Sequence, residues 1–163
     1  MFTVGIITAS DKGSQGLRED VSGALLRTLL EEAGYQVVTY EIVADEEEQL
    51  EASMIKMCDE DHVDLLVTTG GTGFSQRDVT PEATKKVITK ETPGIVEAMR
   101  YYSLQITPRA MLSRAVAGIR NQTLIINLPG SPKAVKENLS FILPSLTHGL
   151  EIMIGSAKEC GRK

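Results

Sequence analysis

The chain has 163 residues of ordinary composition, enough for one domain with a sizeable hydrophobic core. Its formal charge of −5 and its 4% aromatic content argue against a nucleic-acid surface, which needs clustered basic side chains and stacking platforms. No apolar stretch approaches the roughly 20 residues of a membrane span, and the N-terminus lacks the basic segment of a signal peptide. We therefore expect a single cytoplasmic domain over residues 1–163, with no nucleic-acid or membrane partner.

The first part of the chain alternates between strand and helix patterns. Phe2 to Ala9 is a continuous, β-branched run, typical of a strand covered on both faces, and Ser10 to Arg18 is expected to be a loop. Apolar residues recur at helical spacing from Asp20 to Ala33, and Gly34 stands where a helix usually ends. Tyr35 to Val43 is predicted to be the second strand.

The same alternation continues toward the middle of the chain. The acidic run Asp45 to Glu48 favours the N-terminal end of a helix, whose buried face is marked by Leu50, Met54 and Met57. Val63 to Thr69 is predicted to be a third buried strand, and it leads directly into a glycine-rich loop.

Three positions share a hydroxyl residue followed by a proline: Thr80-Pro81, Thr92-Pro93 and Ser131-Pro132. Each pair predicts a helix start in which the hydroxyl caps the first turn and the proline takes the first helical position. The segment from Arg114 to Asn127 is expected to form a hairpin or short connection leading to a strand at Thr123 to Asn127.

The C-terminal part is less regular. Pro144 is expected either to begin the last helix or to kink it, and residues from about 155 to 163 are expected to form a flexible tail. Cys58 and Cys160 lie far apart in no metal-ligand spacing, which predicts free thiols.

Strands that alternate with helices predict an α/β fold, with a mostly parallel sheet and helices on both faces. In such a sheet the loops leaving parallel strands emerge at one edge, where ligands bind. Four segments are then expected at the same edge: Ser10-Asp11, Asp45, Gly70 to Asp78, and Pro129 to Ser131.

The glycine cluster Gly70-Gly71-Thr72-Gly73 follows the third strand. Glycine permits positive φ and close approach, so this loop can present several backbone amides to a phosphate. It matches neither the Walker A phosphate loop nor the dinucleotide-binding G-x-G-x-x-G pattern, because no lysine follows and Gln76 stands in place of the third glycine. A plain strand-to-loop turn is therefore an equally good interpretation of the cluster alone.

Asp45 and Asp78 are the candidate catalytic carboxylates. Each also has a structural interpretation, since Asp45 favours the dipole of the following helix and Asp78 can bond the backbone near Thr80. Carboxylates opposite phosphate-binding amides make chemical sense chiefly if Mg²⁺ bridges them to the phosphate. The pair is therefore also the predicted metal site.

Pro129, Gly130 and Ser131 offer amides at a helix N-terminus, which is a second ready anion site or simply a capped helix. Ser113 and Arg114 can supply a hydroxyl and a cation to a ligand, or can lie on a solvated face.

The segments TTGGTGFSQRDVTPEA, LSRAVAGIRNQTLIINLPGSPKAV and VADEEE resemble the MogA/MoaB family of molybdenum-cofactor biosynthesis, which includes the gephyrin G domain. The resemblance runs from Gly5 to about Leu150. It implies a molybdopterin-binding fold, a homotrimer, and an adenylyltransferase that moves AMP from Mg-ATP to the terminal phosphate of molybdopterin. A downstream molybdenum-insertion protein is a further implied partner.

The resemblance also assigns residues. Asp45 and Asp78 match the catalytic aspartates of the family. The residues implied to bind molybdopterin and nucleotide are Gly70, Gly71, Thr72, Gly73, Ser113, Asn127, Pro129, Gly130 and Ser131.

Three alternatives remain open from the sequence. The chain could be a MoaB-type molybdopterin-binding protein or carrier without transferase activity, or a scaffold. It could also be a nucleotide-binding α/β domain with another phosphoryl acceptor. The presence of both aspartates favours the transferase.

Overall fold

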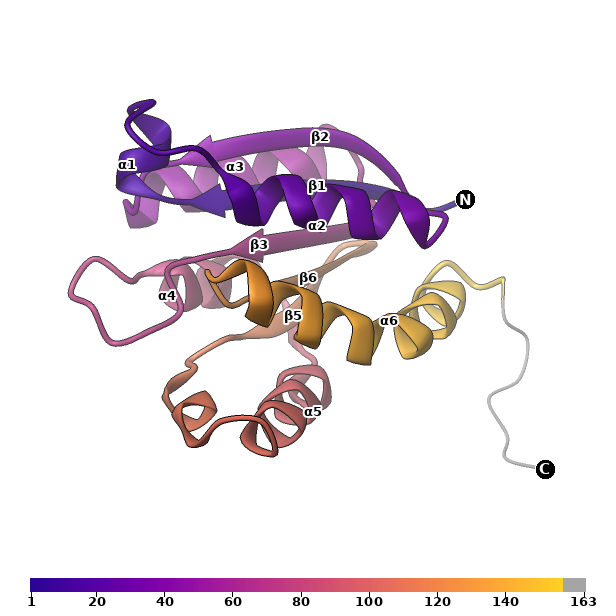
Figure 1. Ribbon diagram of the computed structural model, residues 1–163. Coiled ribbons are helices and arrows are strands. Elements are labelled where there is room, and N and C mark those ends of the chain that lie inside the picture. The colour runs from indigo at the N-terminus through magenta and orange to yellow at the C-terminus, as the bar shows by residue number, and fades with distance from the viewer. Residues whose placement is uncertain (157–163) are drawn as a thin grey trace.

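A six-stranded sheet in the order β2-β1-β3-β6-β5-β4 lies between two layers of helices in the computed structural model, which describes residues 1–156 (Figure 1). The strands are β1 (Thr3–Ala9), β2 (Gln36–Val43), β3 (Leu65–Thr69), β4 (Lys90–Glu91), β5 (Ala117–Arg120) and β6 (Thr123–Leu128). The helices are α1 (Asp11–Ser14), α2 (Val21–Glu32), α3 (Glu47–Asp59), α4 (Thr80–Val87), α5 (Pro93–Leu104), the 3-10 helix η1 (Pro108–Leu112) and α6 (Pro132–Met153).

The sheet is parallel in one part and antiparallel in the other. β2, β1, β3 and β6 run parallel to one another, whereas β5 pairs antiparallel with both β6 and β4. β5 and β6 form the expected hairpin, and Asn121 takes positive φ (52°) in its turn. The predicted α/β class with a mostly parallel sheet is confirmed.

Hydrophobic side chains bury both faces of the sheet. Successive strand residues point to opposite faces, so Ile6 packs into the core beneath α2, α5 and α6, whereas Ile7 packs into the core beneath α3 and α4. Both side chains have no exposed surface. The continuous apolar run of the first strand is explained by this double burial.

Only one of the three hydroxyl-proline pairs caps its helix as expected. Ser131 accepts a hydrogen bond from the Ala134 amide at 3.2 Å, whereas α4 has Val79 at its N-cap and Thr92 makes no side-chain cap. The Thr80 hydroxyl instead donates to the Gly70 carbonyl at 3.0 Å. The helix starts predicted at these two pairs are confirmed, but neither threonine hydroxyl caps its helix. For Thr80, the tertiary contact takes the place of the cap.

Two other expectations are corrected. The segment after β1 contains the one-turn helix α1, capped by Ser10, rather than only loop. Of the two alternatives for Pro144, a helix start is excluded, because the residue lies inside the 22-residue α6. Of the expected tail at about 155–163, residues 157–163 lie outside the described residues, as does Cys160.

Candidate functional site

Loops that follow β1, β2, β3 and β6 meet at one edge of the sheet, as expected for parallel strands. The Asp11 amide donates to Oδ2 of Asp45 at 2.9 Å, and the Gly70 amide donates to the Leu128 carbonyl at 3.3 Å. Segments far apart in the sequence are thereby held as one loop cluster.

The glycine loop after β3 needs glycine at two positions. Gly70 and Gly71 have φ of 93° and 69°, which other residues rarely adopt. A Cβ at Gly70 would also lie 2.5 Å from the Ala9 carbonyl oxygen, and one at Gly130 would lie 3.3 Å from the Gly70 Cα. The glycines therefore let three loops pack backbone against backbone.

Asp45 is half-buried between the loop after β1 and the glycine loop. Its Oδ2 accepts the Asp11 amide, and its Oδ1 faces Gly71, where a Cβ would lie 3.3 Å away. Burial raises the pKa of Asp45 above its ordinary value, and the charges of Asp11 and Asp78 raise it further. The two predicted carboxylates thus lie close enough to influence each other.

Asp78 closes the far end of the glycine loop. Its Oδ2 accepts the Ser75 amide at 3.0 Å, and its own amide donates to the Ser75 carbonyl at 3.0 Å. A Cβ at Gly73 would lie 2.9 Å from the same Oδ2, so the carboxylate is directed at the loop backbone.

Arg114 supports this loop from below. Its Nε donates to the Gly73 carbonyl at 2.7 Å, its Nη2 donates to the Asp78 carbonyl at 2.8 Å, and its Nη1 pairs with Glu82. The sequence suggested either a ligand-binding cation or a solvated side chain for Arg114. In the structure its guanidinium instead holds the loop that carries Asp78.

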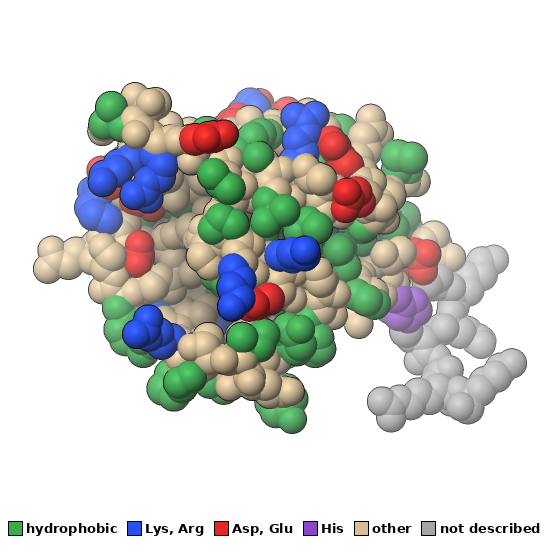
Figure 2. All heavy atoms as spheres, viewed as in Figure 1, with side chains coloured by type: hydrophobic (Ala, Val, Ile, Leu, Met, Phe, Trp, Pro, Cys, Tyr) green, Lys and Arg blue, Asp and Glu red, His purple; other side chains and the backbone are tan. Residues whose placement is uncertain are grey.

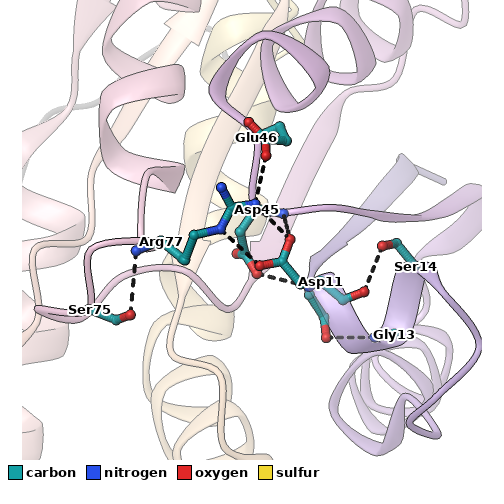
Figure 3. A network of polar contacts seen from close by, with 8 residues as sticks. Asp11, Gly13, Ser14, Asp45, Glu46, Ser75 and Arg77 are labelled. Carbon is teal, nitrogen blue, oxygen red and sulfur yellow. Dashed lines mark hydrogen bonds and ion pairs between the residues drawn. The ribbon is translucent and has the colours of Figure 1, made fainter.

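Asp11 and Arg77 join the site although the sequence assigned neither of them a role (Figure 3). Arg77 lies beside Asp78 in the chain, and its guanidinium binds both oxygens of Asp11 at 3.0 Å. Hydrogen bonding from Arg77 lowers the pKa of Asp11. The available signal for Asp11 was its place directly after the first strand.

The Pro129–Ser131 loop is fixed by neighbours on both sides. The Thr69 hydroxyl donates to the Pro129 carbonyl at 2.7 Å, and the Ser22 hydroxyl donates to the Gly130 carbonyl at 2.7 Å. Ser22 is buried and had no functional signal in the sequence.

Asn127 is fully buried at the end of β6. Its Nδ2 donates to the hydroxyls of Thr68 (3.0 Å) and Thr84 (2.9 Å), and its Oδ1 accepts the Val116 amide at 3.0 Å. The side chain therefore joins β3, α4 and the approach to β5.

Two pockets lie on either side of the paired glycine and proline-glycine loops. A pocket of about 270 Å³ has a largely apolar lining and a second, of about 550 Å³, is more polar. The first is lined by Thr72, Gly73, Met99, Ser113, Pro129 and Asn138, among others. The second is lined by Ser10, Asp20, Ser22, Gly70, Gly130 and Ser131, among others. Consecutive residues of the same two loops thus face different pockets.

The α5–η1 segment supplies one wall of the smaller pocket, including Met99 and Leu112. Ser113, a predicted binding residue outside the edge loops, also lines this pocket. Met99, Leu112 and Asn138 were missed, because their apolar or helical settings look like ordinary core and surface positions in the sequence.

Metal-binding potential is limited to few protein ligands. Within residues 1–156, no group of three or more His, Cys, Asp and Glu side chains is arranged to hold a metal ion. Mg²⁺, however, usually takes one or two protein carboxylates and completes its shell with water and substrate phosphates. The pair Asp45 and Asp78 fits that donor set. Burial chiefly raises the pKa of Asp45, and the nearby charges of Asp11 and Asp78, which a cation would offset, add to the rise.

The site can now be compared with known proteins. The family described as "Probable molybdopterin binding domain" matches residues 5–148. Molybdopterin adenylyltransferase of Helicobacter pylori J99 is 48% identical over 162 residues, covering 98% of this chain and 92% of that protein. Gephyrin of Dictyostelium discoideum is 46% identical over 167 residues, covering 96% of this chain and 23% of gephyrin.

Solved structures give the same result. The molybdopterin biosynthesis enzyme MoaB from Thermus thermophilus superposes with a TM-score of 0.90 at 46% identity, covering 95% of this chain and 98% of that one. These matches span nearly the whole chain and include the edge loops. The chain therefore belongs to the molybdopterin-binding domain family, alongside the MogA and MoaB proteins of molybdenum-cofactor biosynthesis.

Proposed function

We propose that this protein is a molybdopterin adenylyltransferase of molybdenum-cofactor biosynthesis. In the proposed reaction an oxygen of the terminal phosphate of molybdopterin attacks the α-phosphorus of ATP. The bond between the α- and β-phosphates breaks, and pyrophosphate leaves. The observation that carries the proposal is the meeting of Asp45 and Asp78 at the glycine loop, in a chain 48% identical to an adenylyltransferase.

The attacking group is already a phosphate oxygen, so strong general-base activation is unnecessary. The protein must instead align two polyanions and stabilise the charge around the α-phosphate. Amides of Gly70 to Gly73 and of the Pro129–Ser131 loop are proposed to bind phosphate oxygens. Asp45 and Asp78 are proposed to hold Mg²⁺ or to orient its water ligands. When bound, the cation would neutralise phosphate charge.

Two adjoining pockets support a reaction with two substrates. Gly73 and Pro129 line the smaller pocket, whereas Gly70 and Gly130 line the larger one. A ligand in each pocket would place its phosphate at the shared loops, and Asp45 and Asp78 lie beside Gly71 and Gly73 of the glycine loop. Ser113 and Thr72 are proposed to contact the ligand of the smaller pocket. Asn127 is proposed to act indirectly, by holding β6 beneath the loop.

Several wider properties belong to the same proposal. We expect a cytoplasmic homotrimer that passes its product to a molybdenum-insertion protein. None of the helices within residues 1–156 has the length and hydropathy to cross a bilayer. Hydrophobic side chains gather over the lower part of the molecule in Figure 2, where α5 lies, and Tyr101 and Met111 are 71% and 64% exposed. Such a surface supports self-association.

A second candidate is molybdopterin binding without transfer. It is favoured by the likeness to the Thermus MoaB structure, at almost the same identity as to the Helicobacter enzyme. The two functions differ in whether pyrophosphate and adenylylated molybdopterin are formed.

The deciding experiment incubates the purified protein with molybdopterin, ATP and Mg²⁺ and measures pyrophosphate and adenylylated molybdopterin. Equal amounts of both products support the transferase, and addition of a chelator is expected to abolish them. Molybdopterin binding without either product supports the carrier. ATP turnover with another acceptor, or failure to bind molybdopterin, would overturn the proposal.

A further inference from the structure

A charged cluster ties together the three loops that carry the proposed reaction (Figure 3). Asp11 begins α1 after β1, Asp45 follows β2, and Arg77 precedes Asp78 in the glycine loop. The Arg77 Nε donates to Asp11 Oδ2 and its Nη2 donates to Asp11 Oδ1, both at 3.0 Å. Its Nη2 also donates to Glu46 at 2.7 Å. A two-point contact of this kind fixes both distance and orientation.

Asp11 is in turn hydrogen-bonded to Asp45. The Asp11 amide donates to Oδ2 of Asp45 at 2.9 Å, and the Asp45 amide donates back to Oδ1 of Asp11 at 3.0 Å. The reciprocal pair holds the Asp45 backbone and its carboxylate at once. Asp11 Oδ1 therefore accepts from Arg77 and from Asp45 together.

The cluster is poorly placed to contribute much to stability. The side chains of Arg77 and Asp11 are 52% and 35% exposed, and exposed ion pairs contribute little to stability. Its geometry is more informative than its energy. One end of the cluster is Arg77, which precedes Asp78 in the chain, and the other end is Asp45, which is bonded to Asp11.

We propose that Arg77 and Asp11 are positioning residues, which set the separation of the Asp45 and Asp78 carboxylates across the glycine loop. This inference rests on the proposed adenylyl transfer. Without the two-point contact to Asp11, the loop tip that carries Arg77 and Asp78 is bound to the segment that carries Asp45 only through the exposed single contact between Arg77 and Glu46. Misplacement of a reacting group by about 1 Å can cost on the order of 10²-fold in rate.

The test compares Arg77→Lys, Asp11→Asn and the double variant with the wild type in the adenylation assay. Lysine keeps the charge of Arg77 but cannot form the two-point contact, and asparagine keeps the shape of Asp11 but loses its charge. We expect each single variant to lose about 10- to 100-fold in kcat, with the KM for ATP changed less than about threefold. The double variant should be no worse than the more impaired single variant, because one contact is removed in all three.

Arg27→Lys and Glu31→Gln provide matched controls. Arg27 and Glu31 form an ion pair of similar exposure (51% and 47%) on α2, away from the site. These variants should keep the wild-type kcat. All variants should unfold within about 4 °C of the wild type, since an exposed pair contributes little to stability.

Several results would overturn the inference. In an active wild type, a normal kcat for Arg77→Lys or for Asp11→Asn would do so. A rise in KM for ATP with unchanged kcat would mean that Arg77 binds the nucleotide, and losses that multiply in the double variant would mean that the residues act separately. An inactive wild type would instead refute the proposed function.

Discussion

Negative charge is concentrated around Asp45, which is half-buried beside the carboxylates of Asp11 and Asp78. Arg77 offsets part of this charge but binds Asp11 and Glu46 rather than Asp45. A site so arranged is suited to receive a cation together with phosphate groups, because each charge then reduces the cost of the other. The arrangement costs stability in the absence of ligand.

Neutralising either carboxylate is therefore expected to separate activity from stability. Asp45→Asn and Asp78→Asn should each lower kcat for adenylation by on the order of 10²-fold or more, because a charge that positions Mg²⁺ is lost. Asp45→Asn should leave the Tm unchanged or higher, since a crowded negative charge is removed. Adenylation assays and thermal unfolding check both statements, with Asp61→Asn as a control that removes an exposed carboxylate paired with Lys56. Near-normal adenylation by both variants would refute the assignment.

Cys58 predicts a pH dependence of stability. Burial raises the pKa of its thiol to about 11 from an ordinary 9.0. Its contribution to stability is complete below pH 9 and is lost as the pH rises through 11, because only the unfolded chain ionises easily in that range. Between about pH 8 and about pH 11 the wild type should lose about 2 kcal/mol more unfolding free energy than Cys58→Ala. Urea unfolding at both pH values measures this, and equal losses would contradict it.

At the scale of single residues, the sequence indicated the polar side chains that follow strands, but not the side chains that form contacts between distant parts of the chain. The placement of Asp45 and Asp78 at one edge was predictable, because each lies in the loop that follows a strand in the parallel part of the sheet. The bond between Arg77 and Asp11 joins residues 66 positions apart, and no local pattern encodes such a contact. Arg114 was ambiguous for the same reason, since its partners are backbone carbonyls of a distant loop.

Among the secondary-structure elements, β6 shows how the fold prepares the site. The side-chain amide of Asn127 makes three hydrogen bonds, to β3, to α4 and to the chain before β5, and all three are inside the protein. Asn127, which the family resemblance assigned to ligand binding, therefore also holds three parts of the fold together. The Pro129–Ser131 loop, which begins two residues later, is positioned by these hydrogen bonds.

Removal of the Asn127 amide should consequently act on stability first. Asn127→Ala leaves a cavity and deprives the Val116 amide of its partner, which should cost about 2–4 kcal/mol of unfolding free energy. Gln122→Ala, at an exposed position in the β5–β6 turn, should change stability by less than about 0.5 kcal/mol. Denaturant unfolding distinguishes the two. If Asn127→Ala kept full stability and lost only molybdopterin affinity, a direct ligand contact would be the better interpretation.

The order and type of most elements followed from hydrophobic periodicity, because buried strands and amphipathic helices carry it directly. The three hydroxyl-proline pairs each mark a helix start, but their side-chain caps were less predictable. Ser131 caps α6 as predicted, but the Thr80 hydroxyl is drawn to the Gly70 carbonyl by the packing of the glycine loop. One-turn elements such as α1 have too few residues to show any period.

For the molecule as a whole, exposed apolar side chains predict self-association. Residues with large exposed apolar side chains cluster around α5 and η1: Tyr101, Leu104, Ile106, Met111 and Leu112. We expect light scattering after gel filtration to give about three times the chain mass of 17.7 kDa. Constant mass on tenfold dilution would indicate a stable trimer, whereas a mass near that of one chain would contradict the expectation.

The two pockets differ in the origin of their walls. The loops after the parallel strands are shared by both pockets, but the α5–η1 segment between β4 and β5 lines only the smaller one. The segment begins and ends at the short antiparallel strands, outside the parallel part of the sheet. In the proposed reaction this arrangement would separate phosphate binding at the edge loops from recognition of the rest of the ligand. We expect changes in residues 93–112 to alter which ligand the smaller pocket accepts while the edge loops stay intact, so this stretch is the natural target for redesigning substrate choice.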